Sequence, residues 1–224
     1  MFVRRLVFPV VAMVLLFPLP DARAGMSRKF DIPSGSMRPT LEPGDRILVS
    51  TDYYGVNPHR LPFVALPFGG YLGGQEPERG DVAVFILPRD GKTYYVARVI
   101  GLPGDKVQLV DGVVYLNGLP LLQIEEGLFE DGHSRGRLLR ETLPSGRSYR
   151  IVDLITDGPG DNTPPYEVPT GHYFFPGDNR DNSTDSRFSG SVGFIPRNNL
   201  IGRAERIVWS KQGRVSADRK LHDD

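Results

Sequence analysis

Short apolar runs recur along the chain and are separated by turn residues. Many alternate apolar and polar positions or are rich in Val, Ile, Tyr and Phe, a pattern typical of half-buried β-strands. Glycine (26) and proline (20) make up about a fifth of the 224 residues, against about 12% in average usage, so long helices are not expected. The strands are predicted at 46–50, 82–87, 93–100, 106–110, 113–116, 148–154, 172–175 and 200–209.

Two dipeptides indicate how some of these strands are connected. Asp111-Gly112 lies between two predicted strands, and Asn117-Gly118 follows the second of them. Both pairs are strong signals for tight β-hairpin turns. The chain is therefore expected to be mainly antiparallel β, bent around itself in one domain, because 224 residues suffice for one substantial core.

The N-terminus carries a hydrophobic segment that allows two interpretations. Arg4 and Arg5 precede the apolar stretch 6–20, and Ala22 and Ala24 follow it. As a signal peptide, residues 1–24 would be cleaved after Ala24. As a membrane anchor, the stretch is short against the roughly 20 residues that normally span a bilayer. Both interpretations place the folded part outside the cytoplasm, with the two arginines inside.

Three further stretches stand apart from the strand pattern. Residues 61–72 are apolar but broken by proline and glycine, which predicts either a loop on the lipid surface or a core loop. Residues 123–165 turn polar and rich in glycine and proline, and we expect them to be an inserted, non-catalytic β and loop region whose turns carry no chemistry. Residues 211–224 form a polar tail.

Charge and cysteine content exclude several functional classes. Lys plus Arg equals Asp plus Glu at 27 each, so no net field attracts nucleic acid, and no nucleic-acid partner is expected. The absence of cysteine excludes disulfides, thiolate metal ligands and a cysteine nucleophile. The aspartates 178, 181 and 185 lack the alternating spacing of a Ca²⁺ loop, and neither a metal nor a cofactor is expected.

Ser36 is the most conspicuous candidate for chemistry. Gly35 precedes it and Met37 and Pro39 follow, so its hydroxyl lies on a stiff turn, as suits a nucleophile. The alternative is that Ser34 and Ser36 only stabilise a turn or a helix cap. The choice depends on the rest of the chain.

Four segments in order resemble the signature boxes of type I signal peptidases, membrane-bound Ser/Lys endopeptidases that remove signal peptides from exported proteins. The resemblance implies a β-barrel-like catalytic domain over residues 25–210, on the periplasmic side of the bacterial inner membrane. It also implies precursor proteins with small-x-small cleavage sites and membrane lipid as partners. The segments are IPSGSMRPTLEPGDRILV (32–49), RGDVAVF (79–85), YYVARVIGLPGDKV (94–107), and GDNRDNSTDSR (177–187) followed by VGFIPRNNLIGRA (192–204).

The resemblance also assigns roles to individual residues. Ser36 matches the nucleophile, and its backbone N–H together with the hydroxyl of Ser34 would form the oxyanion hole. Ser183 matches the serine that hydrogen-bonds the lysine amine. Asp185 and Arg187 match a charge pair that braces the catalytic strands.

The general base is the point of departure from the family. In the family the general base is a lysine, whose pKa must fall by about three units from about 10.4 to act at neutral pH. This chain has Ala97 at the matching position. Lys92 lies roughly 16 Å away along a strand and on the opposite face. Arg98 cannot deprotonate. No substitute is found among the remaining lysines and the histidines, which are Lys29, Lys106, Lys211, Lys220, His59, His133, His172 and His222.

Three interpretations follow from Ala97. The chain is a working signal peptidase with an unrecognised base, an inactive relative that binds signal peptides without cutting them, or a laboratory substitution of an active parent. Loss of the base should leave it nearly inactive, because a general base contributes about 10²–10⁴-fold. A self-cleaving, DNA-binding Ser/Lys regulator is excluded, since residues 1–30 hold a hydrophobic leader instead of a helix-turn-helix segment.

Overall fold

The computed structural model describes residues 26–55, 73–211, 213, 220 and 221. The predicted leader or anchor, residues 1–24, and the whole of the predicted lipid-facing loop, residues 61–72, lie outside these residues, as does most of the polar tail. Among the residues described, no helix has the length and apolar character needed to cross a membrane.

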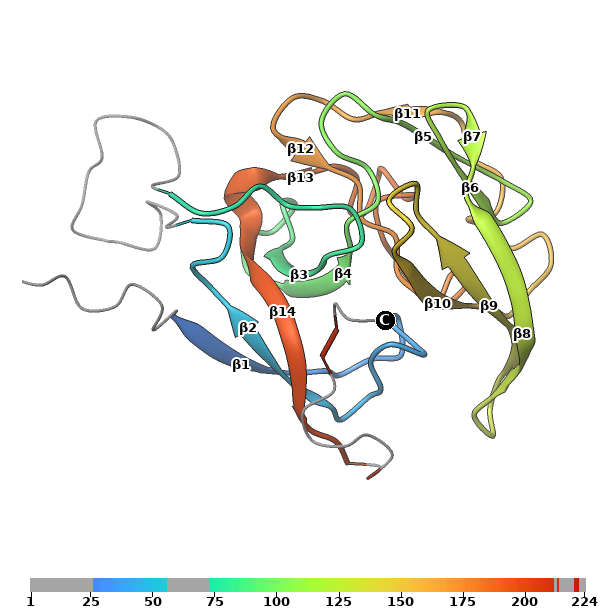
Figure 1. Ribbon diagram of the computed structural model, residues 1–224, viewed down its shortest axis with the longest axis horizontal. Helices are drawn as coiled ribbons and strands as arrows, with labels where there is room; N and C mark the ends of the chain where they lie inside the picture. Colours follow the sequence, from blue (N-terminus) through green and yellow to red (C-terminus); the bar gives the residue numbers. More distant parts are fainter. Residues whose placement is uncertain (1–25, 56–72, 212, 214–219, 222–224) are drawn as a thin grey trace, which may run out of the picture.

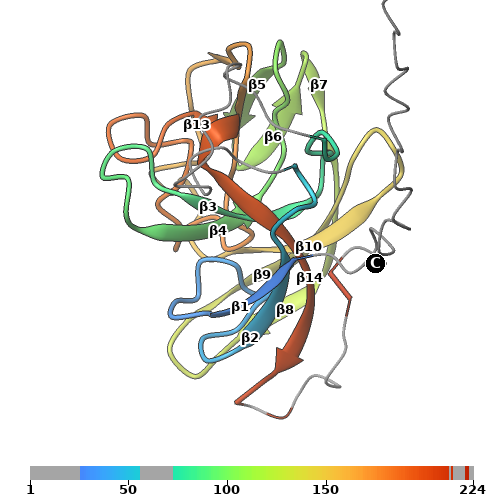
Figure 2. The same ribbon diagram turned by 90° about the vertical axis from the view of Figure 1, so that its left-hand side faces the viewer.

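A five-stranded antiparallel sheet forms one half of the molecule (Figure 1). β1 and β4 are its outer strands, yet the Phe30 ring of β1 lies 5.4 Å from the Tyr94 ring of β4. The sheet is therefore curled, which brings its two ends together (Figure 2). In spatial order its strands are β1 (Ser27–Asp31), β2 (Arg46–Ser50), β14 (Leu200–Trp209), β3 (Val82–Ile86) and β4 (Tyr94–Arg98).

The other half is built from smaller antiparallel sheets. Asp111 (φ 48°) and Gly112 (φ 76°) both adopt positive φ between β5 and β6, so the predicted Asp-Gly hairpin is present. One sheet has the order β11 (Tyr166–Glu167), β5 (Lys106–Val110), β6 (Val113–Leu116) and β7 (Leu119–Pro120). A second sheet has the order β10 (Ser148–Asp153), β9 (Arg135–Thr142) and β8 (Leu122–Glu130). In a third, β12 (His172–Tyr173) pairs with β13 (Ile195–Pro196), and a 3₁₀ turn, η2 (Arg197–Asn199), follows β13.

Two buried apolar clusters stabilise these halves. The first packs against the five-stranded sheet and includes Ile47, Val84 and Phe175. The second lies among the smaller sheets and includes Leu109 and Ile151. The mainly antiparallel β class expected from the apolar pattern is thus confirmed.

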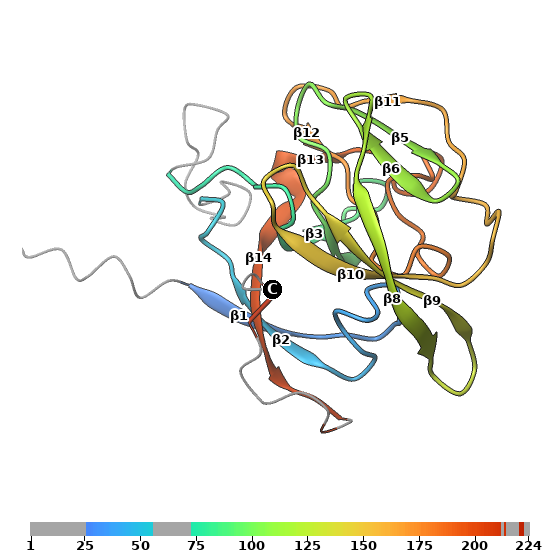
Figure 3. The same ribbon diagram turned by 45° about the vertical axis from the view of Figure 1, so that its right-hand side comes forward.

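The stretch 123–165 is more regular than its turn-rich composition suggested. β8 and β9 pair along their length in a long hairpin that runs beside β10 (Figure 3). One face of this sheet carries charge, since Glu126 of β8 accepts hydrogen bonds from Arg140 of β9 (2.5 Å) and Arg150 of β10 (2.6 Å). Charged residues on a solvated face weaken the apolar alternation by which strands are recognised, and this accounts for the missed strands.

Candidate active site

Ser36 lies on a closed turn between β1 and β2. The Ile32 N–H donates to the Asp45 carbonyl at 2.8 Å, and the Gly44 N–H donates to the Ile32 carbonyl at 2.7 Å, which closes the base of the turn. Met37 and Leu41 are completely buried and anchor it in the core. The turn therefore presents a partly exposed Ser36 hydroxyl on an ordered support, as its glycine and proline content predicted.

Ser34 lies beside Ser36, as the resemblance implied. The two Oγ atoms are 3.2 Å apart, within hydrogen-bonding distance. A hydroxyl at this position can donate toward an oxygen that develops negative charge when Ser36 attacks a carbonyl.

Ser36, the candidate nucleophile, borders a pocket of about 350 Å³. The pocket lies between the turn 32–45, here called the nucleophile turn, β4 and the segment around Ser183. Ala97 belongs to the pocket wall and is only 3% exposed. Within the described chain, neither a lysine nor a histidine lines this pocket. Its lining residues are Pro33, Ser34, Ser36, Phe85, Thr93, Tyr94, Tyr95, Val96, Ala97, Asn182, Ser183, Thr184 and Asp185.

Gly177 brings Ser183 against the nucleophile turn. A Cβ on Gly177 would lie 2.2 Å from Ser183 Oγ and 2.7 Å from the Ser36 carbonyl oxygen, so only glycine permits this approach. Asn179 adds two hydrogen bonds, from its backbone N–H to the Ser36 carbonyl at 3.0 Å and from Nδ2 to the Gly35 carbonyl at 3.1 Å. The segment 177–183 therefore holds the nucleophile turn directly.

Asp185 and Arg187 form the buried charge pair expected from the sequence. Arg187 donates from Nε to Asp185 Oδ1 (2.9 Å) and from Nη2 to Oδ2 (2.8 Å). Asp185 Oδ2 also accepts the Gly177 N–H at 2.8 Å, and Arg187 Nη2 reaches the Arg180 carbonyl at 2.5 Å. These bonds fix the two ends of the loop that carries Ser183.

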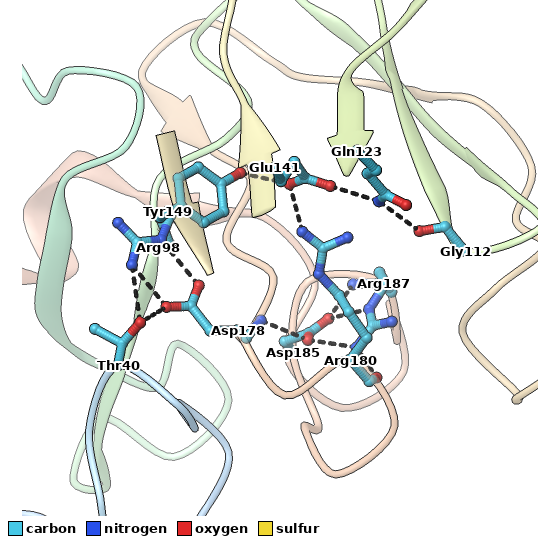
Figure 4. Close-up of polar contacts among 11 residues, drawn as sticks. Thr40, Arg98, Gly112, Gln123, Glu141, Tyr149, Asp178, Arg180, Asp185 and Arg187 are labelled. Carbon is cyan, nitrogen blue, oxygen red and sulfur yellow. Dashed lines mark hydrogen bonds and ion pairs between the residues drawn. The ribbon is translucent and has the colours of Figure 1, made fainter. Parts of the chain in front are cut away.

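Arg98, the neighbour of Ala97, is tied to Asp178 and remains charged. Its Nε donates to Asp178 Oδ1 (2.9 Å) and its Nη2 to Oδ2 (2.6 Å), while Thr40 donates to the same carboxylate (Figure 4). Burial lowers the pKa of Arg98, but attraction to Asp178 and their hydrogen bonds outweigh it and raise the pKa. Arg98 therefore supports the site and cannot accept the proton from Ser36.

None of the other rejected bases within the described residues lines the pocket. Lys92 lies in the turn before β4, and Lys29 and Lys106 lie on β1 and β5. His133 lies at the tip of the β8–β9 hairpin, and His172 begins β12. His59 and His222 fall outside the described residues. Among the residues described, no group of His, Asp and Glu side chains could hold a metal ion.

A second buried polar cluster was not anticipated from the sequence (Figure 4). Glu141 of β9 accepts a 2.5 Å bond from Arg180 Nη2, a 2.5 Å bond from the Tyr149 hydroxyl and a 2.8 Å bond from Gln123. The Arg98 guanidinium lies 4.1 Å from the Tyr149 ring centre, which continues the network toward Ala97. The sequence feature that could have revealed this cluster is a glutamate at an inward-facing strand position, since Glu141 alternates with buried Leu139 and Leu143.

The chain is similar to known signal peptidases. The family model "Signal peptidase, peptidase S26" matches residues 3–209. Signal peptidase I of Rickettsia typhi is 42% identical over 191 residues, covering 81% of this chain and 71% of its own. Signal peptidase I of Rickettsia bellii is 39% identical over 190 residues, covering 81% and 65%. A solved signal peptidase I of Enterococcus faecalis is 27% identical over 58% of this chain and 97% of that one, with a TM-score of 0.35.

Proposed function

The chain belongs to the signal peptidase family, peptidase S26, and we propose that its site binds exported precursor proteins and directs Ser36 at the end of their signal peptides. The observation that carries the proposal is the single pocket that joins Ser36 and Ser34 to Ser183 and Ala97. The resemblance assigns each of these positions a role in peptide hydrolysis.

The peptide would bind in an extended form along β4. β4 is an outer strand that pairs only with β3 in the described sheet. Its other edge can accept an added strand ahead of Arg98, whose backbone N–H donates to the Pro176 carbonyl. In an extended peptide, alternate side chains point to the same face. The small residues of a small-x-small sequence would then both point toward the wall formed by Val96, Ala97 and Phe85.

The chemistry assigned to the site is acyl transfer to Ser36. Its Oγ would attack the scissile carbonyl carbon, with the backbone N–H of Ser36 and the hydroxyl of Ser34 donating to the resulting oxyanion. The peptide C–N bond then breaks to give an acyl ester on Ser36, which water hydrolyses. The Ser36 proton must pass to a base and on to the leaving amine, and Ala97 has no group that can accept it.

Ala97 also favours a second function, peptide binding without efficient cleavage. The alanine is buried in the pocket, and no lysine or histidine of the described residues lines it. The contacts of Ser34, Ser183 and the Asp185–Arg187 pair support the proposal that the groove is retained. We therefore propose that this chain retains the signal-peptide groove and cleaves slowly until a base is restored.

We further propose that the catalytic unit works on the periplasmic face of the bacterial inner membrane, in contact with lipid. The support is the family and the hydrophobic pattern of residues 6–20 and 61–72. If residues 1–24 are instead removed, the mature protein would begin at Gly25 and be periplasmic. Sequencing the mature N-terminus distinguishes the two outcomes.

Peptide binding tests the proposed groove without requiring catalysis. A fluorescent signal peptide with alanine at both small positions should bind the protein, as measured by fluorescence anisotropy. Replacing one small residue with tryptophan should weaken binding by about tenfold or more, in the 10–200-fold range that pocket fit provides. Equal affinity for the two peptides would contradict the proposed groove.

A further inference from the structure

The tip of the β8–β9 hairpin contacts the turn that carries Ser36 through side chains. Arg38, two residues after Ser36, donates from Nη1 to Asp131 Oδ2 at that tip. Its Nε donates to Glu42 on the same turn at 2.7 Å. The side chains of Arg38 and Asp131 are only 19% and 12% exposed, so the ion pair is shielded from water. The inserted region therefore reaches the candidate active site.

The hairpin tip holds the Asp131 carboxylate in place before Arg38 contacts it. Asp131 Oδ1 accepts the backbone N–H groups of His133 (2.9 Å) and Ser134 (2.6 Å). These backbone hydrogen bonds, with a further contribution from Arg38, lower the pKa of Asp131. The carboxylate is thus ionised at neutral pH and oriented by its own loop. Charge-assisted hydrogen bonds of this kind are stronger than those between neutral groups.

Arg38 in turn covers the residue that precedes the nucleophile. A Cβ on Gly35 would lie 3.1 Å from Arg38 Cδ and 3.2 Å from its Nε, so the extended arginine packs directly on this glycine. The Gly35 carbonyl also accepts the bond from Asn179. A change in the position of the Arg38 side chain would therefore alter the backbone on both sides of Ser36.

We propose that Asp131 is a positioning residue for Ser36, acting through Arg38. The β8–β9 hairpin, which the sequence assigned to a non-catalytic insertion, would fix the nucleophile turn by this contact. The importance of that position for peptide cleavage rests on the proposed function, but the contact can be tested without catalysis.

The chain contains no cysteine, so Ser36→Cys places a single thiol at the nucleophile position. Iodoacetamide alkylates it when the thiolate displaces iodide. The rate is measured across pH, because the limiting rate above the thiol pKa reports access and geometry separately from ionisation. Adding Asp131→Asn should raise that limiting rate about threefold or more, because a turn released from the hairpin opens locally more often and exposes the thiol.

Two matched variants test whether the effect depends on the position of the Asp131 carboxylate, and not on the loss of a negative charge or on general destabilisation. Glu130→Gln removes the same charge from the adjacent, exposed residue and should leave the limiting rate unchanged. Asp131→Glu restores the carboxylate and should return the rate toward that of Ser36→Cys alone. Circular dichroism and thermal unfolding identify a variant that has lost its fold.

An unchanged limiting rate in a folded Asp131→Asn variant would overturn the proposal, and so would an equal rise in Glu130→Gln. If Asp131→Asn destabilises the protein, Arg38→Lys provides a second test, since lysine keeps the charge but not the two-sided contact. It should also raise the limiting rate, and an unchanged rate would contradict the proposal. Failure of signal-peptide binding would contradict the proposed function and leave the alkylation result intact.

Discussion

Glu141 of β9 and Arg180 of the loop that carries Ser183 form a buried ion pair, with 2.5 Å between Oε1 and Nη2 and side chains 0% and 2% exposed. Tyr149 and Gln123 complete the hydrogen bonding of the carboxylate. This pair joins the three-stranded sheet to the loop that carries Ser183. Arg180 directly follows Asn179, which holds the carbonyls of Gly35 and Ser36.

Glu141→Gln should therefore destabilise the protein strongly. The substitution keeps the shape of the side chain but leaves the Arg180 charge buried without a counter-ion, which typically costs about 3–5 kcal/mol. Urea denaturation at neutral pH measures the loss in the free energy of unfolding. Glu126→Gln is the matched control on β8, since Glu126 pairs with Arg140 and Arg150 at the surface. A loss no larger than that of the control would contradict the role of the buried pair.

The same residue predicts how stability responds to acid. Burial raises the pKa of Glu141, but attraction to Arg180 and hydrogen bonds from Arg180, Tyr149 and Gln123 outweigh it and hold the pKa below its usual range. The charged carboxylate therefore contributes stability above the pKa of the unfolded chain, about 4.3, and loses it as pH falls through the folded value. The difference in unfolding free energy between the wild type and Glu141→Gln should shrink in acid. If the difference stays constant or grows in acid, the Glu141 charge is not the source of the stability.

Gly177→Ala should disturb the site at one defined point. The added methyl group would lie 2.2 Å from Ser183 Oγ and 2.7 Å from the Ser36 carbonyl oxygen, and overpacking of this kind costs about 1–3 kcal/mol. The midpoint temperature of thermal unfolding and the affinity for the signal peptide should both fall. Gly190→Ala is the control, because a Cβ there meets nothing within 4 Å. Equal behaviour of the two variants would mean that Ser183 is not held against the nucleophile turn.

Ser34→Ala tests the proposed oxyanion donor and is made in the Ala97→Lys background, where cleavage is expected. Loss of one such donor lowers kcat by about 10²–10³-fold, whereas KM should change little, because the donor acts on the charge that develops in the transition state. Steady-state kinetics on a precursor with a small-x-small site separates the two constants. A change confined to KM would assign Ser34 to substrate binding instead.

The sequence predicted strands with clear apolar alternation better than strands that carry several charges. The boundaries expected for 46–50, 106–110, 113–116 and 200–209 are those of β2, β5, β6 and β14. These strands show clear apolar alternation or lie next to Asp-Gly and Asn-Gly turns. β1, with the sequence SRKFD, and β8 carry too many exposed charges for the same signal. Their conformation depends on pairing with β2 and β9, which a local pattern does not record.

The candidate site shows the same division. Ser34 and Ser36 are neighbours in sequence, and the structure places them 3.2 Å apart. Ser183 and the Asp185–Arg187 pair came from the resemblance, and the structure brings all three to the same loop. The roles of Glu141 and Asp131 could not be read from the sequence. Each makes its contact across a large sequence separation, between the inserted sheet and a catalytic loop.

Cleavage by the chain and by its Ala97→Lys variant tests the central claim that Ala97 occupies the place of the missing base. The chain as written and its Ala97→Lys variant are assayed together on one precursor with a small-x-small site, with Ser36→Ala added to each. A buried lysine there would have a depressed pKa and could accept the Ser36 proton, so Ala97→Lys should raise the rate by about 10²-fold or more, and Ser36→Ala should abolish the gain. Efficient Ser36-dependent cleavage by the chain as written, with no gain from Ala97→Lys, would contradict the claim.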